Sequence, residues 1–168
     1  MKALMDFARK LGAYFALNVD FTVEKADRYF LLNKKLQSIS HRDFYYAGLY
    51  LGKVKNARFF PSFNLLAMLA KGKANKIVVD GKAAWLFICG RDVFRRGILT
   101  LHGPRRKGDY VLVMNEFGEC LGFGKILCNA DNAVQGGGCC EEHFGCWGFS
   151  AQRNLKGQRG WLYPTRLF

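Results

Sequence analysis

Apolar residues recur at helical spacing in two segments of the N-terminal half. Between residues 4 and 17 a single apolar stripe is formed by Leu4, Phe7, Ala8, Leu11, Tyr14 and Phe15. This spacing predicts an amphipathic helix, which Gly12 weakens by about 1 kcal/mol relative to alanine without having to end it. The segment FNLLAMLAK (63–71), which follows Pro61-Ser62, predicts a second helix. It carries few polar residues, so we expect it to be buried.

Between these helices, strand-like runs alternate with turn residues. DFTVE (20–24) and RYFLL (28–32) flank Lys25-Ala26-Asp27, which predicts two strands joined as a hairpin. NKKLQSIS (33–40) is expected to form one helical turn. FYYAGLYLGKV (44–54) is rich in aromatic and β-branched residues and predicts a further strand.

After a soft boundary at residues 71–75 the pattern changes to short strands around one helix. Asp80 precedes GKAAWLFIC, where its carboxylate can cap a helix, and Gly90 suits the left-handed position that commonly ends one. A four-residue hairpin loop is predicted at 116–119. We expect a β-rich module over 76–128 with the strands KIVV, ILTLH, YVLVMN and CLGFGKIL.

The remaining residues have a different composition. Residues 129–148 contain three consecutive glycines and few branched apolar residues, which predicts a loop insertion. The tail from residue 150 regains basic and aromatic residues, and we expect it to pack back on the module. We therefore predict an α+β protein of two domains, residues 1–73 and 74–168.

Charge narrows the possible partners. The chain has 26 Lys and Arg against 13 Asp and Glu, a formal charge of +13, and a polyanion such as nucleic acid would relieve the resulting self-repulsion. The longest apolar run, FNLLAMLA, is far shorter than the ~20 residues of a membrane span. Charged residues at positions 6, 9 and 10 interrupt the start of the chain. We expect a protein that is neither exported nor membrane-bound.

The positive charge is concentrated in two segments. Six basic residues lie between Arg91 and Lys107, opposed only by Asp92, and the connections that hold them bracket one predicted strand. We expect them to form a patch along one rim of the module. The tail carries Arg153, Lys156, Arg159 and Arg166 with Trp161 and Tyr163 beside them. Arginine interleaved with aromatic rings suits unpaired bases, although a solvated basic face gives the same pattern.

Cysteines offer a different hypothesis. Cys139, Cys140, His143 and Cys146 are the ligand types of a zinc site, but the spacing is irregular and no CxxC pair is present. Cys89, Cys120 and Cys128 lie in or beside apolar segments, which predicts buried free thiols. We expect these cysteines to lie in a reducing compartment.

The sequence contains no convincing set of catalytic residues. We therefore expect a protein that is not an enzyme.

Residues 76–127 resemble a PUA domain. The pattern is a strand, a short helix ending in Gly90-Arg91-Asp92-Val93, a strand, a basic turn ending in Gly108-Asp109, and a hairpin into Gly122-Phe123-Gly124. The preceding half, with its leading helix, YYAGLYLGKV and the helix after FFPSFN, resembles the pre-PUA domain of the Nip-seven family. The tail piece RNLKGQRGWL is similar to that family's C-terminal end.

This resemblance implies an α/β pre-PUA domain with an antiparallel sheet, followed by a PUA-type β pseudo-barrel. It implies a factor in large-ribosomal-subunit biogenesis that binds single-stranded U- or A/U-rich rRNA without catalysis and contacts other assembly proteins through its N-terminal half. The family's basic tail positions match Arg153 and Lys156, whereas two further ones fall on Phe149 and Ser150, where charge is absent. Arg105, Arg106 and Lys107 could substitute for them.

We therefore predict an RNA-binding assembly factor that is cytoplasmic, or nuclear and nucleolar in a eukaryote. One alternative is a PUA accessory protein of tRNA or rRNA modification; another is a zinc- or thiol-dependent protein using residues 139–146. No cofactor is expected for the main hypothesis. The predicted RNA contacts are Lys82, Arg91, Arg105, Arg106, Lys107, Lys125, Arg153, Lys156 and Trp161.

Overall fold

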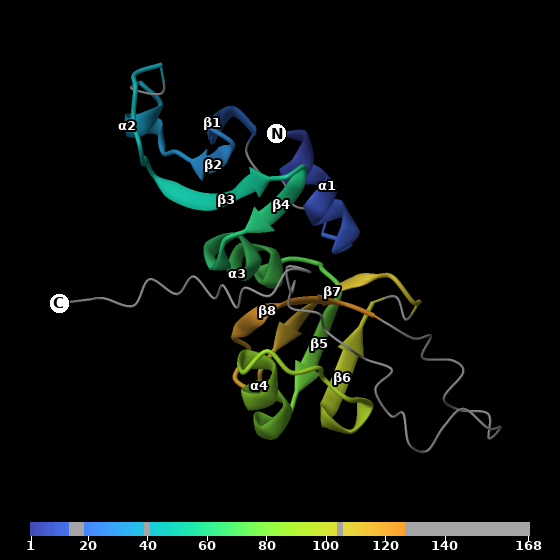
Figure 1. The fold of residues 1–168 in the computed structure, drawn as a ribbon. Helices are drawn as coiled ribbons and strands as arrows, with labels where there is room; N and C mark the ends of the chain where they lie inside the picture. Colours follow the sequence, from blue (N-terminus) through green and yellow to red (C-terminus); the bar gives the residue numbers. More distant parts are fainter. Residues whose placement is uncertain (14–18, 39–40, 104–105, 127–168) are drawn as a thin grey trace.

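The computed structural model describes residues 1–13, 19–38, 41–103 and 106–126, and Figure 1 shows how the elements are arranged. Predictions that fall on the loop insertion, the C-terminal tail and the Cys/His cluster lie outside these residues. The predicted fold class is confirmed: the chain is α+β, with an antiparallel sheet in the N-terminal half and a second sheet after it. The predicted domain boundary lies between the two sheets, and it stays a prediction.

The first sheet, sheet A, is a fully antiparallel meander. Its strands follow the chain in the order β1-β2-β3-β4. The predicted hairpin is confirmed, and its turn residues Ala26 and Asp27 both have positive φ, as a two-residue turn between twisted strands requires. The strands are β1 (Thr22–Lys25), β2 (Arg28–Leu31), β3 (Leu49–Lys55) and β4 (Arg58–Pro61).

The predicted helices are present, with one correction. α3 (Phe63–Lys71) has the predicted bounds, and α2 (Lys34–Gln37) is the predicted single turn. A 3-10 turn, η1 (Val19–Phe21), precedes β1. α1 (Lys2–Lys10) is shorter than predicted: it ends before Gly12, whose φ of +63° is incompatible with a continuing right-handed helix. β4 was not predicted, because RFFP ends in Pro61, which cannot donate a hydrogen bond to a neighbouring strand and indicates a break.

The second sheet, sheet B, is mixed and has the order β6-β5-β7-β8. β5 pairs parallel with β7, and the other two pairs are antiparallel. This arrangement confirms the predicted module of short strands around one helix. The elements are β5 (Lys76–Val79), α4 (Gly81–Ile88), the 3-10 turn η2 (Arg95–Gly97), β6 (Ile98–His102), β7 (Tyr110–Met114) and β8 (Cys120–Lys125).

Alternation along β7 divides the core between the two faces of sheet B. Val111 and Val113 pack toward α4, whereas Leu112 and Met114 join the core that contains α1 and α3. α1 and α3 therefore lie between the two sheets, and α4 covers the far face of sheet B (Figure 1). A separate small core on the outer face of sheet A is built around Phe30, Leu32 and Ala47.

Cys128 lies outside the described residues, whereas two cysteines lie within them, and both of these thiols are free. Cys120 is half-buried, and burial raises the pKa of its thiol. Cys89 is exposed, so the predicted burial is wrong there: the residue follows α4 on its solvent side. Within the described part of the chain, none of the helices has the length and apolar character of a membrane span.

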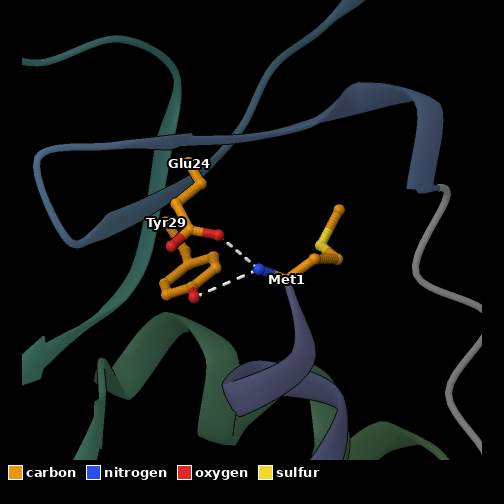
Figure 2. A network of polar contacts seen from close by, with 3 residues as sticks. All are labelled: Met1, Glu24 and Tyr29. Carbon is orange, nitrogen blue, oxygen red and sulfur yellow. Dashed lines mark hydrogen bonds and ion pairs between the residues drawn. The ribbon is translucent and has the colours of Figure 1, made fainter. Parts of the chain in front are cut away.

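The N-terminal amine links α1 to sheet A through hydrogen bonds. Figure 2 shows the amine of Met1 donating to the carboxylate of Glu24 and to Tyr29 Oη, the latter at 3.1 Å. The bond from the amine lowers the pKa of Glu24. Burial, and then the neighbouring Glu24 carboxylate, raise the pKa of Tyr29 to about 12.

The helix cap at Asp80 generates the first prediction. Asp80 Oδ1 accepts a hydrogen bond from Ala83 N at 2.7 Å, so Asp80→Ala should cost about 1 kcal/mol of unfolding free energy. Urea denaturation would show a lower midpoint with an unchanged slope. Asp80→Ser keeps a capping oxygen and should retain most of the stability. Equal losses in the two variants would contradict the role of the cap.

Tyr29 generates a prediction at alkaline pH. A tyrosine whose pKa is raised on folding stabilises the protein fully below pH 10, and this stabilisation is lost as the pH rises toward about 12. The wild-type unfolding free energy should therefore fall over that interval by on the order of 2 kcal/mol more than that of Tyr29→Phe. Denaturant titrations at each pH give the unfolding free energies of both proteins. If these free energies change in parallel with pH, the phenol does not titrate in this way.

Candidate nucleic-acid interface

Four exposed cations of the module make no ion pair within the described residues. The ion pairs within the described residues all lie between residues 1 and 43: Met1–Glu24, Arg9–Asp6 and Lys25–Asp43. Lys82, Arg91, Arg106 and Lys125 are exposed and make no ion pair there. Because these charges are not neutralised within the described fold, they can attract an anionic ligand.

The connection from β6 to β7 places its basic residues beside the end of β8. Gly108 N donates to Ile126 O at 2.7 Å, and Ile126 N donates to Asp109 O at 2.9 Å. The Asp109 carboxylate accepts from Arg106 N at 3.2 Å. Gly108 has a φ of +100°, and a Cβ on it would lie 3.8 Å from Lys125 Cε. The turn with Arg106 and Lys107 is therefore fixed next to Lys125.

Tyr110 provides an aromatic ring at the same place. Tyr110 and Lys125 are cross-strand partners, so their side chains share a face of sheet B. Phe123 stacks on Tyr110 with ring centroids 6.2 Å apart, and Lys10 Nζ of α1 lies 5.8 Å from the Tyr110 ring centroid. We call Lys10, Arg106, Lys107, Lys125 and Tyr110 the junction group, since α1 and sheet B meet there.

The junction group borders a large cleft. Tyr110 and Lys10 line a cleft of about 890 Å³ between α1, sheet A and the start of β7. Its other lining side chains mix aromatic residues with both signs of charge and include Phe7, Tyr29, Phe59, Arg58, Asp6 and Glu24. The cleft itself is therefore close to neutral, and the uncompensated charge lies at its border with Arg106 and Lys125.

A second set of basic residues lies at the start of α4. Lys82 and Arg96 line a hollow of about 250 Å³ together with Asp80, Asp92 and Phe94. Two carboxylates oppose the two cations there, and one of them already caps α4. Arg91 lies beyond the other end of the helix, where its backbone N–H donates to Leu86 O. These positions favour anions less than the junction group does.

The predicted single basic rim is wrong. Arg91, Arg95 and Arg96 precede β6, whereas Arg106 and Lys107 follow it, and the register places Ile98 opposite Val79 and His102 opposite Lys76. The two connections lie at opposite ends of sheet B (Figure 1). An extended strand of this length separates its ends by about 15 Å, so the residues that bracket it cannot share a rim.

Several predicted contacts and the alternative metal site cannot be placed. Arg105, Arg153, Lys156 and Trp161 lie outside the described residues, as do Cys139, Cys140, His143 and Cys146. Within the described ranges no group of three or more His, Cys, Asp or Glu side chains is placed to hold a metal ion. Lys107 is exposed and already takes part in an interaction within the chain.

Two members of the junction group were missed by the sequence analysis. Lys10 ends α1 and Tyr110 begins β7, and one hundred positions separate them, so only the tertiary fold brings them together. For Tyr110 a signal was available: it directly follows the basic turn that ends in Gly108-Asp109. No pattern in the sequence pointed to Lys10.

Comparison with known proteins identifies the class of the module. Residues 75–146 match the family model described as the UPF0113 PUA domain, and the PUA domain is an RNA-binding fold. The resemblance to a PUA domain is thereby confirmed for this part of the chain. No curated protein matches the chain.

Solved structures of three archaeal proteins are among those similar to parts of this chain. A hypothetical protein of Pyrococcus horikoshii is 19% identical, with 78% of this chain and 81% of that chain covered and a TM-score of 0.46. A conserved PUA domain protein of Thermoplasma acidophilum is 20% identical, with 69% and 68% covered and a TM-score of 0.45. A PUA domain protein of Aeropyrum pernix is 18% identical, with 56% of this chain and half of that chain covered and a TM-score of 0.41.

The junction group generates a charge-matched prediction. Arg106→Ala/Lys125→Ala and Lys82→Ala/Arg91→Ala each remove two exposed positive charges from the module. If the junction group contacts phosphates, the first variant should flatten the dependence of log affinity on log salt by about 1.4 for a single strand. Lys82→Ala/Arg91→Ala should change this salt dependence little. Binding of an oligouridylate at several salt concentrations checks this, and equal slopes for the two variants would refute a localised site.

Proposed function

We propose that this protein is a non-enzymatic RNA-binding protein. The observation that carries the proposal is the junction group: exposed Arg106 and Lys125, which make no ion pair with any described residue, lie beside the turn and strand that carry Tyr110, in a segment that matches a PUA domain model. Arginine and lysine bind phosphate oxygens through charge-assisted hydrogen bonds. An aromatic face beside them stacks with an unpaired base.

The mechanism is electrostatic docking followed by stacking of a few unpaired bases. Arg106 and Lys125 would hold backbone phosphates, and Tyr110 would offer the exposed part of its ring to a base. Arg105, Lys107, Arg153, Lys156 and Trp161 would extend the contact along the strand. Stacking needs bases that are free of a duplex, so the ligand is single-stranded RNA. The resemblance to the Nip-seven family adds U- or A/U-rich segments as the expected class.

At a finer level, we propose a Nip-seven-type factor in biogenesis of the large ribosomal subunit. The order of the two halves supports this: an α/β half with an antiparallel sheet precedes the segment that matches the PUA domain model. The RNA would be rRNA, and the N-terminal half would contact other assembly proteins. The protein would act in the cytoplasm, or in the nucleus and nucleolus of a eukaryote.

Crosslinking the protein to RNA in cells, followed by sequencing, tests the proposal. Precursor rRNA of the large subunit should be enriched, and Arg106→Ala/Lys125→Ala should reduce its recovery at equal protein level. Enrichment of tRNA instead would favour an accessory role in RNA modification.

In vitro, contact with about five phosphates predicts that log affinity falls with log salt at a slope near −3.5 for a single strand. Affinity that does not depend on salt would contradict the mechanism.

A further inference from the structure

A second cationic surface lies on sheet A, on the face that points away from α1. Lys25 pairs with Arg28 across β1 and β2, and Arg28 pairs with Lys53 across β2 and β3, so the three side chains share one face. Tyr29, the next residue along β2, is buried in the core with α1. Because neighbouring side chains alternate along a strand, Arg28 points to the opposite, outer face.

The segment 42–46 packs over this face and is held there by Lys25. Lys25 Nζ donates to Arg42 O at 2.8 Å and forms an ion pair with Asp43 at 2.6 Å. It also lies 4.7 Å from the centroid of the Phe44 ring. The ion pair lowers the pKa of Asp43. These contacts fix the backbone just before two consecutive tyrosines.

Those two tyrosines are exposed, yet their positions are fixed. Tyr45 is 80% exposed and Tyr46 is 59% exposed. The Arg28 guanidinium lies 4.6 Å from the Tyr45 ring centroid and donates to Tyr45 Oη at 3.4 Å. Tyr46 packs edge-on against Phe30, whose side chain is fully buried, with centroids 5.4 Å apart. Both rings are therefore pre-ordered at the surface, which lowers the entropy cost of binding.

We propose that Lys25, Arg28, Lys53, Tyr45 and Tyr46, which we call the tyrosine surface, bind single-stranded RNA at a second site. Two exposed rings beside cations are the combination that stacks bases and holds phosphates. The charge favours an anionic ligand such as RNA over an apolar protein partner. Within this surface Lys25 is neutralised by Asp43, whereas Arg28 and Lys53 make no ion pair with any described residue. An apolar partner would bury those two charges without compensation, which is costly.

The tyrosine surface is separate from the junction group. β1, β2 and α2 lie at the end of the molecule opposite to sheet B, with α1 and α3 between the two sheets (Figure 1). The second site therefore goes beyond the proposed function of the module. RNA binding at the tyrosine surface can be tested separately from RNA binding at the junction group. Two sites on one chain would also raise the overall affinity for an RNA long enough to reach both.

The test compares substitutions of exposed aromatic residues in the full chain. The probe is a fluorescent single-stranded oligouridylate, and the background is Arg106→Ala/Lys125→Ala, which removes two of the four cations of the junction group. Tyr45→Ala should weaken binding roughly 5- to 100-fold, the range of one lost base stack. Tyr45→Phe keeps the ring and should stay within about twofold of the background. Phe117→Ala is the matched control, because Phe117 is 87% exposed on the β7–β8 turn between two glutamates.

Unchanged affinity in Tyr45→Ala, or equal losses in Tyr45→Ala and Phe117→Ala, would overturn the proposal. Polyglutamate serves as a second probe, and a loss confined to it would assign the surface to an acidic protein partner instead. Thermal unfolding of each variant excludes misfolding as the cause of a loss. If the junction variant alone leaves RNA affinity unchanged while Tyr45→Ala abolishes it, the proposed function of the module fails and the tyrosine surface stands.

Discussion

The contact of three aromatic rings from separate elements holds the two halves of this protein together. Phe7 of α1 packs against Phe59 of β4 with centroids 5.4 Å apart and edge-on against Phe123 of β8 at 5.0 Å. Asn75 reinforces the contact: its backbone N–H donates to Leu11 O, and its side chain donates to Tyr110 O. Because of this packing, Lys10 of the N-terminal helix lies beside Tyr110 of the module.

Charge distribution explains how this packing bears on function. The described ion pairs cluster in the N-terminal part, whereas Lys82, Arg91, Arg106 and Lys125 of the module are exposed and make no ion pair with any described residue. A net charge of +13 opposes compaction through self-repulsion, and the aromatic and aliphatic core between the sheets offsets that cost. Lys25 has a structural role instead: its contacts with Arg42 O and Asp43 order the segment that carries Tyr45 and Tyr46.

Local patterns predicted local structure well. The cap at Asp80, the left-handed Gly90 and the bounds of α3 all follow from one or two residue types acting on their own backbone. The end of α1 was mispredicted, because apolar spacing continues past Gly12 although the backbone there turns left-handed. The spacing of apolar residues indicates which face of a helix is buried. It does not indicate where the helix ends so that the chain can turn toward another element.

The candidate sites were less accessible to sequence reasoning. Arg106 and Lys125 stood out by charge, but their proximity depends on the register of β7 and β8. The register of β5 and β6 separates Arg106 from Arg91 and Arg96, which a linear count of charges had grouped. Tyr45 and Tyr46 fell within a predicted strand, where one of two neighbouring residues is normally buried. They lie before β3 instead, so both can be exposed.

The most direct measurement of the central claim is an amide-resolved NMR titration of the isotope-labelled protein with a single-stranded oligouridylate. The account predicts shift changes at residues 106–110 and 125 and at residues 28 and 44–46, with the β7–β8 turn at 116–118 unaffected. Shift changes that spread evenly over all exposed basic residues, or that avoid both sets, would contradict the claim that RNA binds at uncompensated cations beside exposed aromatic rings.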